Sequence, residues 1–519
     1  MRLFVRVKGT SPFLLNIDGS NYTIEQLVDF VQNCYNELYD YRGVTNLTLL
    51  RVCSFRGEDK VLFFDKEGGD DGEGGARPTD PSVQEYIPIY SEPEESARNP
   101  VCAAPPPGTL TQNFVIKVAS LNRLLLMLTS PDYDNYMIDV FFNTYRTFTS
   151  PRVVLEKLIQ RFSVPYPEGP DWATRTPFQY QFFLSSIKLP IQVTICKLMQ
   201  RWIENYLFDF DADMVEIFKD FVQYALPAAG HIGLANTLYK SMFPDSSCPN
   251  PNRILVSKKD FLSISEFPMG KRRSLLEFSD RDIAEQLTLM DWELYKEIRF
   301  VELIGQCWNK EEKRFRAPNV MLCIERFNII SNWVSFCILN EETLRARIKV
   351  FSRFVQILDR LRELNSFNMI FAVNSGLNQI AVHRLKHTHG SLKPDVAFLH
   401  KDILKLIATD ANFRSYREYL SGCTTAIPYL GVCLKDLTFI EDGNPKFLDG
   451  MVNFMRCIHI YNVQYFIRRF QLSSDYSHLT GNREVIAYLN SFREPVDERK
   501  LYAMSLKREP RNVTKDKLK

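Results

Sequence analysis

The sequence predicts a mainly α-helical protein with a small α+β domain at its N-terminus. Apolar residues recur every three to four residues between positions 109 and about 226, and again from Ser279 almost to the C-terminus. The second of these regions lacks hairpin turns and the regular spacing of strands. Residues 1–67 differ, because apolar and polar residues alternate there over short stretches, as in half-buried strands.

In the N-terminal domain, residues 1–67, the apolar pattern predicts the order strand, strand, helix, strand, strand. Apolar residues from Ile24 to Leu38 form one helical stripe, and Thr23 and Gln26 have capping-box spacing just before it. By this order the region resembles the ubiquitin-like β-grasp fold. The predicted strands span residues 3–7, 13–17, 47–52 and 61–64.

Two stretches of the chain predict linkers. Residues 68–108 are rich in glycine, acidic residues and proline. Their glycines lack the Gly-Lys-Ser/Thr ending of a phosphate-binding loop, and the acids would repel phosphate, which argues against a nucleotide site. Residues 231–278 hold prolines and a basic run before Ser274, where a solvated charge cluster is favoured over a kinase site. The helical domains are therefore predicted at 109–230 and 279–511.

Composition excludes several classes of function. The chain has 519 residues, and its 64 basic and 62 acidic side chains leave a net charge of +2, without the field of a nucleic-acid or membrane-surface binder. Eleven cysteines with no Cys-x-x-Cys indicate a reducing compartment. The first residues lack a signal-peptide core, and the apolar run 327–340 is too short to cross a bilayer. We expect a cytoplasmic protein without a membrane-spanning segment.

The sequence carries none of the common catalytic or metal-binding motifs. The sequence has no nucleophile elbow, zincin helix or paired-carboxylate signature. The histidines His383, His387 and His389 are the only metal-like cluster, but Arg384 and Lys386 lie between them. We expect structural or surface histidines, no metal and no cofactor. Such a chain works through binding energy, by favouring one state of a partner.

The segment 427–454 predicts two helices around an acidic elbow. Apolar residues recur at helical spacing on both sides, and Gly443, Asn444 and Pro445 predict the end of one helix and the start of the next. Glu441 and Asp442 lie at the C-terminal end of the first helix, where the macrodipole disfavours negative charge. From these residues alone, a partner-binding tip and a solvated acidic turn are about equally supported.

Eight blocks follow one another along the chain: 282–288, 317–319, 326–328 with Ser331 and Trp333, 364–368, 375–378, 384–385, 427–454 and 508–511. In this order they resemble the catalytic domain of Ras-type guanine nucleotide exchange factors. The likeness covers about 279–511, and the block 144–148 with Ser150 and Pro151 resembles the exchanger motif that precedes such domains. It implies that Asn365 and Asn368 are buried packing residues, with Trp333, Leu287 and Leu385 in the core.

The resemblance implies nucleotide exchange on a Ras- or Rap-type small GTPase, without covalent chemistry. In the family, the helical hairpin moves the first switch segment away from the nucleotide. The slot for an apolar side chain near the magnesium site falls on Thr438. The slot for an acid near the phosphates falls on Asp442, and Glu441 beside it could fill this slot instead. Threonine is less apolar and aspartate one methylene shorter than the common pattern, and the threonine resembles Rap-directed members.

Other positions of the resemblance imply direct contacts with the GTPase. Asn378 and Tyr429 occupy contact slots, while Phe413 and Tyr416 form an aromatic pair for the second switch region. A second GTPase is a further possible partner, through the N-terminal domain or the exchanger motif, and the substrate GTPase would recruit the protein to a membrane. The rival hypothesis is a non-catalytic scaffold that binds GTPases without displacing nucleotide.

Overall fold

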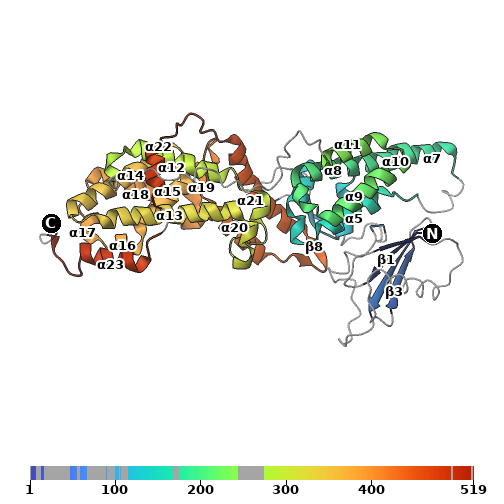
Figure 1. Cartoon of the computed structure of the whole chain (residues 1–519), viewed down its shortest axis with the longest axis horizontal. Helices are drawn as coiled ribbons and strands as arrows, with labels where there is room; N and C mark the ends of the chain where they lie inside the picture. The colour runs from blue at the N-terminus through green and yellow to red at the C-terminus, as the bar shows by residue number, and fades with distance from the viewer. Residues whose placement is uncertain are drawn as a thin grey trace. The chain divides into compact units, whose positions relative to one another are not determined.

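The computed structural model divides into two compact units, which are described separately. Unit 1 contains Met1–Asp80 and Ser163–Lys188, and unit 2 contains Pro81–Phe162 and Leu189–Lys519 (Figure 1). Residues 163–188 therefore group apart from the rest of the helical domain that was predicted to include them. The structure describes residues 2–7, 13–16, 47–54, 59–66, 89–90, 100–103, 106, 115–131, 133–166, 175–243, 274–492, 495–515 and 518.

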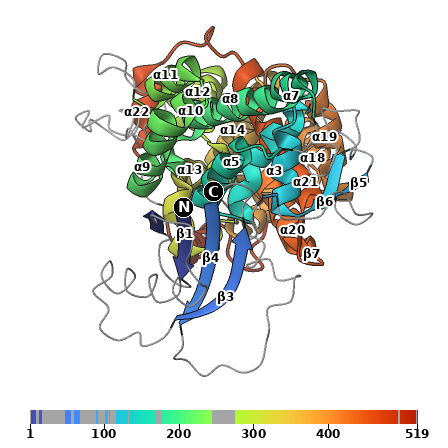
Figure 2. The same ribbon diagram turned by 90° about the vertical axis from the view of Figure 1, so that its right-hand side faces the viewer.

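Unit 1 contains a mixed four-stranded sheet with the order β2-β1-β4-β3. The central strands β1 and β4 are parallel, and the two outer pairs are antiparallel (Figure 2). The strands lie where alternation predicts them, and the predicted helix of residues 24–38 lies outside the described residues. The ubiquitin-like assignment stays a prediction. The strands are β1 (Arg2–Val7), β2 (Phe13–Asn16), β3 (Leu47–Ser54) and β4 (Asp59–Lys66).

The first helical domain of unit 2 begins with a strand and continues as helices. Ser120, Asp134 and Asp211 cap three of these helices through their side-chain oxygens, as short polar residues do. The elements are β6 (Val115–Ala119), α3 (Leu121–Leu128), α4 (Asn135–Thr144), η1 (Tyr145–Thr147), α5 (Pro151–Phe162), α8 (Leu189–Tyr206), η3 (Leu207–Asp209), α9 (Ala212–Asp220), η4 (Phe221–Ala225), α10 (Leu226–Ala228) and α11 (Ile232–Met242).

One of these helices lies where the sequence predicted a linker. Helix α11 occupies the start of the stretch 231–278 and packs against α8, burying Leu238 and Met242. The helical domain thus continues beyond residue 230.

In unit 1, α7 (Pro177–Phe183) begins with a capping box between Thr176 and Gln179.

A buried carboxylate organises the first helical domain. Asp209 accepts hydrogen bonds from the Tyr145 hydroxyl at 2.6 Å and from Trp202 Nε1 at 2.8 Å. The guanidinium of Arg146 donates to the same carboxylate, with Nε at 2.7 Å from Oδ1. Charge-assisted bonds of this kind stabilise a buried acid, so the block 144–148 contributes directly to the core.

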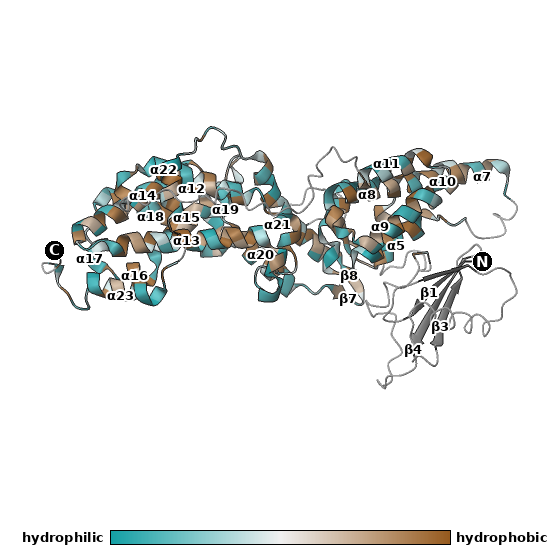
Figure 3. Ribbon diagram, viewed as in Figure 1, coloured by the Kyte–Doolittle hydropathy of each residue, from teal (hydrophilic) through white to brown (hydrophobic). Residues whose placement is uncertain are grey.

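The second helical domain is built around α13, α14 and α15, which pack on one another. Trp333, Leu287 and Leu385 are buried, as predicted, and apolar residues concentrate along these helices (Figure 3). The helices are α12 (Asp280–Tyr295), α13 (Pro318–Asn340), α14 (Leu344–Glu363), α15 (Phe367–Asn378), α16 (Ile380–His383), α17 (Lys386–His389), α18 (Pro394–Leu406), α19 (Asp410–Ser421), α20 (Leu430–Gly443), α21 (Phe454–Ser473), α22 (Arg483–Asn490) and α23 (Glu498–Arg508), with η5 (Leu275–Glu277), η6 (Phe300–Leu303) and η7 (Glu311–Arg316).

Two segments, Pro177–Asp209 and Pro318–Asn340, are long and apolar enough by composition to cross a membrane. The second is α13, which begins well before the run 327–340 considered in the sequence. Its side chains at Trp333, Val334 and Ile338 are buried in the core of the domain. Core packing therefore accounts for the apolar character of α13.

The segment that follows α20 corrects the prediction of a helical hairpin. Pro445 does not start a helix, and α21 begins only at Phe454. Between them, β7 (Phe447–Leu448) and β8 (Met451–Asn453) form a tight β-hairpin. Asp449 and Gly450 form its turn with φ values of 49° and 79°, as an Asp-Gly turn favours.

This β-hairpin extends a second sheet with the order β5-β6-β8-β7, in which β5 spans Val101–Ala103. Strand β8 pairs with β6, with Val118 opposite Asn453 and Ala119 opposite Val452. The Asn453 side chain also accepts from the Arg456 amide and caps α21. The backbone before Phe454 is thus engaged in a sheet, which excludes a helix there.

Candidate functional site

The base of α20 is fixed by two asparagines. The Asn365 side chain donates to the Thr425 carbonyl at 3.0 Å. Asn368 is buried, and its oxygen accepts from the Leu430 amide at 3.4 Å while its nitrogen donates to Asp291 at 2.8 Å. Both asparagines therefore have packing contacts, but only Asn368 is buried as predicted, whereas Asn365 is half-buried. The contacts set the position from which α20 starts.

Asp291 completes this base from α12. The carboxyl is fully buried, and burial raises its pKa from the ordinary value to about 7, against the opposing effects of the Asn368 hydrogen bond and the Arg326 charge. Its Oδ2 atom has no hydrogen-bond partner in the described part of the chain. Burial also lowers the pKa of Arg326 to about 10. The base of α20 therefore contains a carboxyl that titrates near neutral pH.

Tyr429, a predicted contact residue, precedes the first turn of α20. Its ring lies between those of Phe371 and Phe327, with centroids 4.1 and 5.5 Å away. Its backbone amide donates to the Tyr416 hydroxyl at 2.8 Å. Gly431 makes room for the ring, because a Cβ at this position would lie 2.4 Å from Tyr429 Cζ. The half-buried Tyr429 is thus held in one orientation.

The predicted aromatic pair lies deeper than a contact surface. Tyr416 is 2% exposed and packs edge-on against Phe367 and Phe371, while Phe413 is 9% exposed. The hydroxyl of the buried Tyr416 instead fixes the backbone of the half-buried Tyr429. Ala411, Asn412 and Phe413 all have left-handed backbone angles, which bulky residues rarely adopt.

Asn378 lies at the end of α15 and is exposed, as a contact residue requires. Its side chain donates to Asn374 Oδ1 at 3.0 Å, one helical turn away. Among the described contacts it joins none of the other predicted site residues, whereas Tyr429, Tyr416 and Phe413 share the aromatic ring of Phe371.

The exposed end of α20 carries the remaining predicted residues. Thr438 is half-buried, and its hydroxyl donates to the Leu434 carbonyl at 2.9 Å. The Glu441 side chain is 7% exposed, accepts from the Gly305 amide at 2.8 Å, and pairs with Arg456 at 3.7 Å. Asp442 is exposed and accepts from Gln306 Nε2 at 2.6 Å. The two adjacent acids thus have different environments.

Sequence reasoning missed several residues around α20. Phe439 is 63% exposed directly after Thr438, with the Lys435 ammonium 5.5 Å from its ring centroid. Arg417 of α19 binds Asp436 of α20 through two contacts of 2.9 and 2.8 Å. The sequence could have indicated Phe439, since an aromatic side chain opposite the apolar stripe of a helix faces solvent. No sequence pattern indicated Arg417.

The first helical domain contacts the helix that follows the β-hairpin. The Tyr136 hydroxyl of α4 donates to Asn462 Oδ1 at 2.8 Å, and its ring meets the Tyr461 ring edge-on at 5.5 Å. Helix α21 packs against both α4 and α20. Strand β6 and helix α4 therefore support α21, which in turn supports α20.

The histidines have structural partners. The ring nitrogens of His387 and His389 lie 2.8 and 3.2 Å from the carbonyls of Val513 and Val382. Across the described residues, no group of three His, Cys, Asp or Glu side chains could hold a metal ion.

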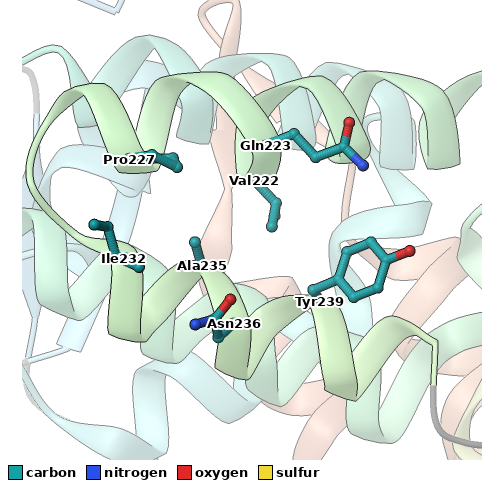
Figure 4. Close-up of a pocket in the computed structure, with 7 residues that line it drawn as sticks. All are labelled: Val222, Gln223, Pro227, Ile232, Ala235, Asn236 and Tyr239. Atoms are coloured by element: carbon teal, nitrogen blue, oxygen red, sulfur yellow. The ribbon is translucent and has the colours of Figure 1, made fainter.

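A groove of about 330 Å³ lies between η4, α10 and α11 (Figure 4). Its only titratable side chain is Tyr239, so it holds no acid–base pair of the kind that catalytic sites use. The lining residues are Val222, Gln223, Pro227, Ile232, Ala235, Asn236 and Tyr239.

Comparison with known proteins identifies both helical domains. Residues 282–458 match the RasGEF domain model, and residues 115–224 match the RasGEF N-terminal motif. Ras guanine nucleotide exchange factors J and A of Dictyostelium discoideum are 31% and 30% identical to the chain over 430 and 417 residues. These matches cover 78% and 77% of this chain, but only 49% and 66% of the relatives. The chain belongs to the Ras guanine nucleotide exchange factor family, with a RasGEF domain preceded by a RasGEF N-terminal motif.

Proposed function

We propose that the chain stimulates GDP release from a Ras-family small GTPase. The observation that carries the proposal is the fixation of α20 at both ends. Asn368 holds its first turn, while Gly305 and Arg456 hold Glu441 in its last turn. A helix fixed in this way can enter a partner without losing much conformational freedom of its own. The exposed end of α20 would insert at the switch I, magnesium and phosphate region.

The energetics of this mechanism are those of linked binding. A GTPase that holds its nucleotide at picomolar affinity has a binding free energy of about −16 kcal/mol, so spontaneous release is slow. If the exchange factor favours the empty GTPase, factor and nucleotide weaken each other by the same coupling free energy. No covalent step is required.

Ras and Rap types are both candidate substrates, and we favour Rap. The support is the segment Asp436 to Ile440, in which Thr438 resembles Rap-directed members of the family, and the exposed Phe439 ring, which offers an apolar contact beside it.

The test is release of a fluorescent GDP analogue from a panel of Ras, Rap and Ral-type GTPases. Acceleration with a Ras or Rap protein is expected, with the larger effect on Rap. No acceleration across the panel would contradict the proposal. Tight binding to the loaded GTPase with unchanged release would instead favour the scaffold hypothesis, while selective binding to the nucleotide-free form would exclude it.

For the N-terminal region we propose a ubiquitin-like domain that binds an activated GTPase or shields the exchange surface. The support is the mixed sheet with parallel central strands. We expect a cytoplasmic protein that its GTPase recruits to a membrane. Deleting residues 1–108 should then change the exchange rate or this recruitment. An identical rate and distribution would remove this idea. A second GTPase on the N-terminal domain or the exchanger motif would appear as binding that survives loss of the α20 tip.

A further inference from the structure

The turn Gly305-Gln306 supplies two hydrogen-bond donors to the C-terminal end of α20. The Gly305 amide donates to Glu441 Oε1 at 2.8 Å, and Gln306 Nε2 donates to Asp442 Oδ1 at 2.6 Å. Carboxylates at this end of a helix are opposed by the helix macrodipole. The two donors of the turn offset this unfavourable interaction. They explain how two acids are tolerated at the C-terminal end of α20.

The backbone of the turn is in an unusual conformation that aims these donors. Gly305 and Gln306 have φ values of 68° and 52°. Glycine tolerates this region, whereas glutamine adopts it only where the surroundings hold it. The Asn309 amide donates to the Gln306 carbonyl at 3.0 Å, and Cys307 Sγ donates to the Ile304 carbonyl at 3.2 Å, so the turn is closed on both sides.

The carboxylates of Glu441 and Asp442 differ in burial and in the number of their partners. Glu441 is nearly buried and bound by both Gly305 and Arg456. Asp442 is exposed, and only its Oδ1 accepts a hydrogen bond in the described part of the chain. The hydrogen bond to Oδ1 restricts the rotation of the carboxylate and leaves Oδ2 without a hydrogen-bond partner among the described residues. The geometry therefore separates a structural acid from an oriented, available one.

We propose that Gln306 is a positioning residue for exchange, which orients Asp442 toward the GTPase. The inference rests on the proposed function, because the orientation matters only if Asp442 meets a partner. An exposed amide–carboxylate bond adds little to folding stability. A misdirected charged group, in contrast, slows a reaction that depends on its placement. The amide acts through Asp442 and not on the GTPase itself.

The experiment compares Gln306→Ala and Gln306→Gly with wild type in fluorescent GDP release at increasing GTPase concentration. Both variants lose the amide, but glycine also relieves the strained backbone, so Gln306→Gly should unfold at a higher temperature than Gln306→Ala. We expect both to lower the maximal exchange rate about three- to tenfold with KM nearly unchanged. Asn309→Ala, on the same loop, should exchange at the wild-type rate.

A double-mutant cycle with Asp442→Ala, which removes the acceptor of the Gln306 hydrogen bond, separates positioning from other roles. If Gln306 acts through Asp442, adding Gln306→Ala to Asp442→Ala lowers the rate no further. Three outcomes would overturn the inference while leaving the proposed function intact. They are losses that multiply in the double variant, wild-type rates in both Gln306 variants, and rates that follow the melting temperatures of the variants. A wild-type protein that accelerates release from no GTPase would overturn the proposed function and the inference together.

Discussion

At the scale of single residues, substitutions of the neighbours Glu441 and Asp442 should have different effects. The first should lower the stability of the fold, and the second should lower the exchange rate. Glu441→Gln removes the charge that faces Arg456, whose side chain is 3% exposed and whose Nε has no partner in the described structure. Breaking a buried pair of this kind should cost about 3 kcal/mol of unfolding free energy. Asp442→Asn should stay within about 0.5 kcal/mol of wild type but lower the exchange rate.

Urea unfolding and GDP release measured on the same two variants check this division. A loss of stability with Asp442→Asn equal to that with Glu441→Gln would mean that the acidic end of α20 has only a structural role.

Asp291 predicts a pH dependence of stability. Its folded pKa of about 7 lies above its ordinary value of 3.8, so the folded state holds the proton more tightly than the unfolded state. The stabilisation is complete below about pH 4 and disappears as pH rises to about 7. Between pH 5 and pH 8 the wild type should lose roughly 2 to 3 kcal/mol from this group.

Asp291→Asn keeps an acceptor for Asn368 and cannot titrate. Its unfolding free energy, relative to wild type, should therefore rise between pH 5 and pH 8 by the same amount. Chemical denaturation at the two pH values measures it, and a constant difference between the proteins would refute the raised pKa.

At the scale of elements, the start of α20 depends on a close approach between Gly431 and Tyr429. Gly431→Ala places a Cβ 2.4 Å from the Tyr429 ring, so the ring must leave its stack with Phe371. We expect a loss of about 1 to 3 kcal/mol and slower exchange. Gly443→Ala is the matched control on the same helix, because a Cβ there meets nothing within 4 Å.

Thermal unfolding and GDP release test both glycine variants together. If Gly431→Ala matched Gly443→Ala in stability and rate, the stacked position of Tyr429 would not matter for the site.

The sequence predicted α20 well but not the element after it. Leu430, Leu434 and Leu437 fit only a helix, whereas the apolar residues from Phe447 to Val452 fit both helical and strand spacing. The Asp449-Gly450 turn was the local signal for a β-hairpin. The deciding partner, strand β6, lies far away in sequence, so spacing alone was insufficient.

The site shows the same limit. The acidic end of α20 was visible in the sequence, because two acids at a helix C-terminus are unusual. Gln306 and Gly305, which bind these acids, lie 136 residues earlier. The depth of Tyr416 was also hidden, since an aromatic residue suits a core and a contact surface equally well.

At the scale of the whole molecule, the two helical domains of unit 2 meet through Tyr136 and Asn462. Tyr136→Phe removes only the hydroxyl and should cost about 1 kcal/mol, the net contribution of one hydrogen bond. Because α21 supports α20, the exchange rate should fall as well. Tyr239→Phe, in the groove of the same helical domain, is the control and should change neither quantity.

Calorimetry and GDP release on these two variants measure the effect. Unchanged exchange with Tyr136→Phe, despite lower stability, would show that this contact between the domains holds the fold without influencing α20.

The pairing of β6 with β8 also constrains how the protein is made. Val118 and Asn453 lie 335 residues apart in the chain, and loop closure of this length precedes any gain from the pairing. During synthesis, β6 emerges long before its partner and exposes an unpaired strand edge in the meantime. The support of α20 is consequently completed among the last steps of folding, and nascent chains that stop short of β8 carry an edge prone to aggregation.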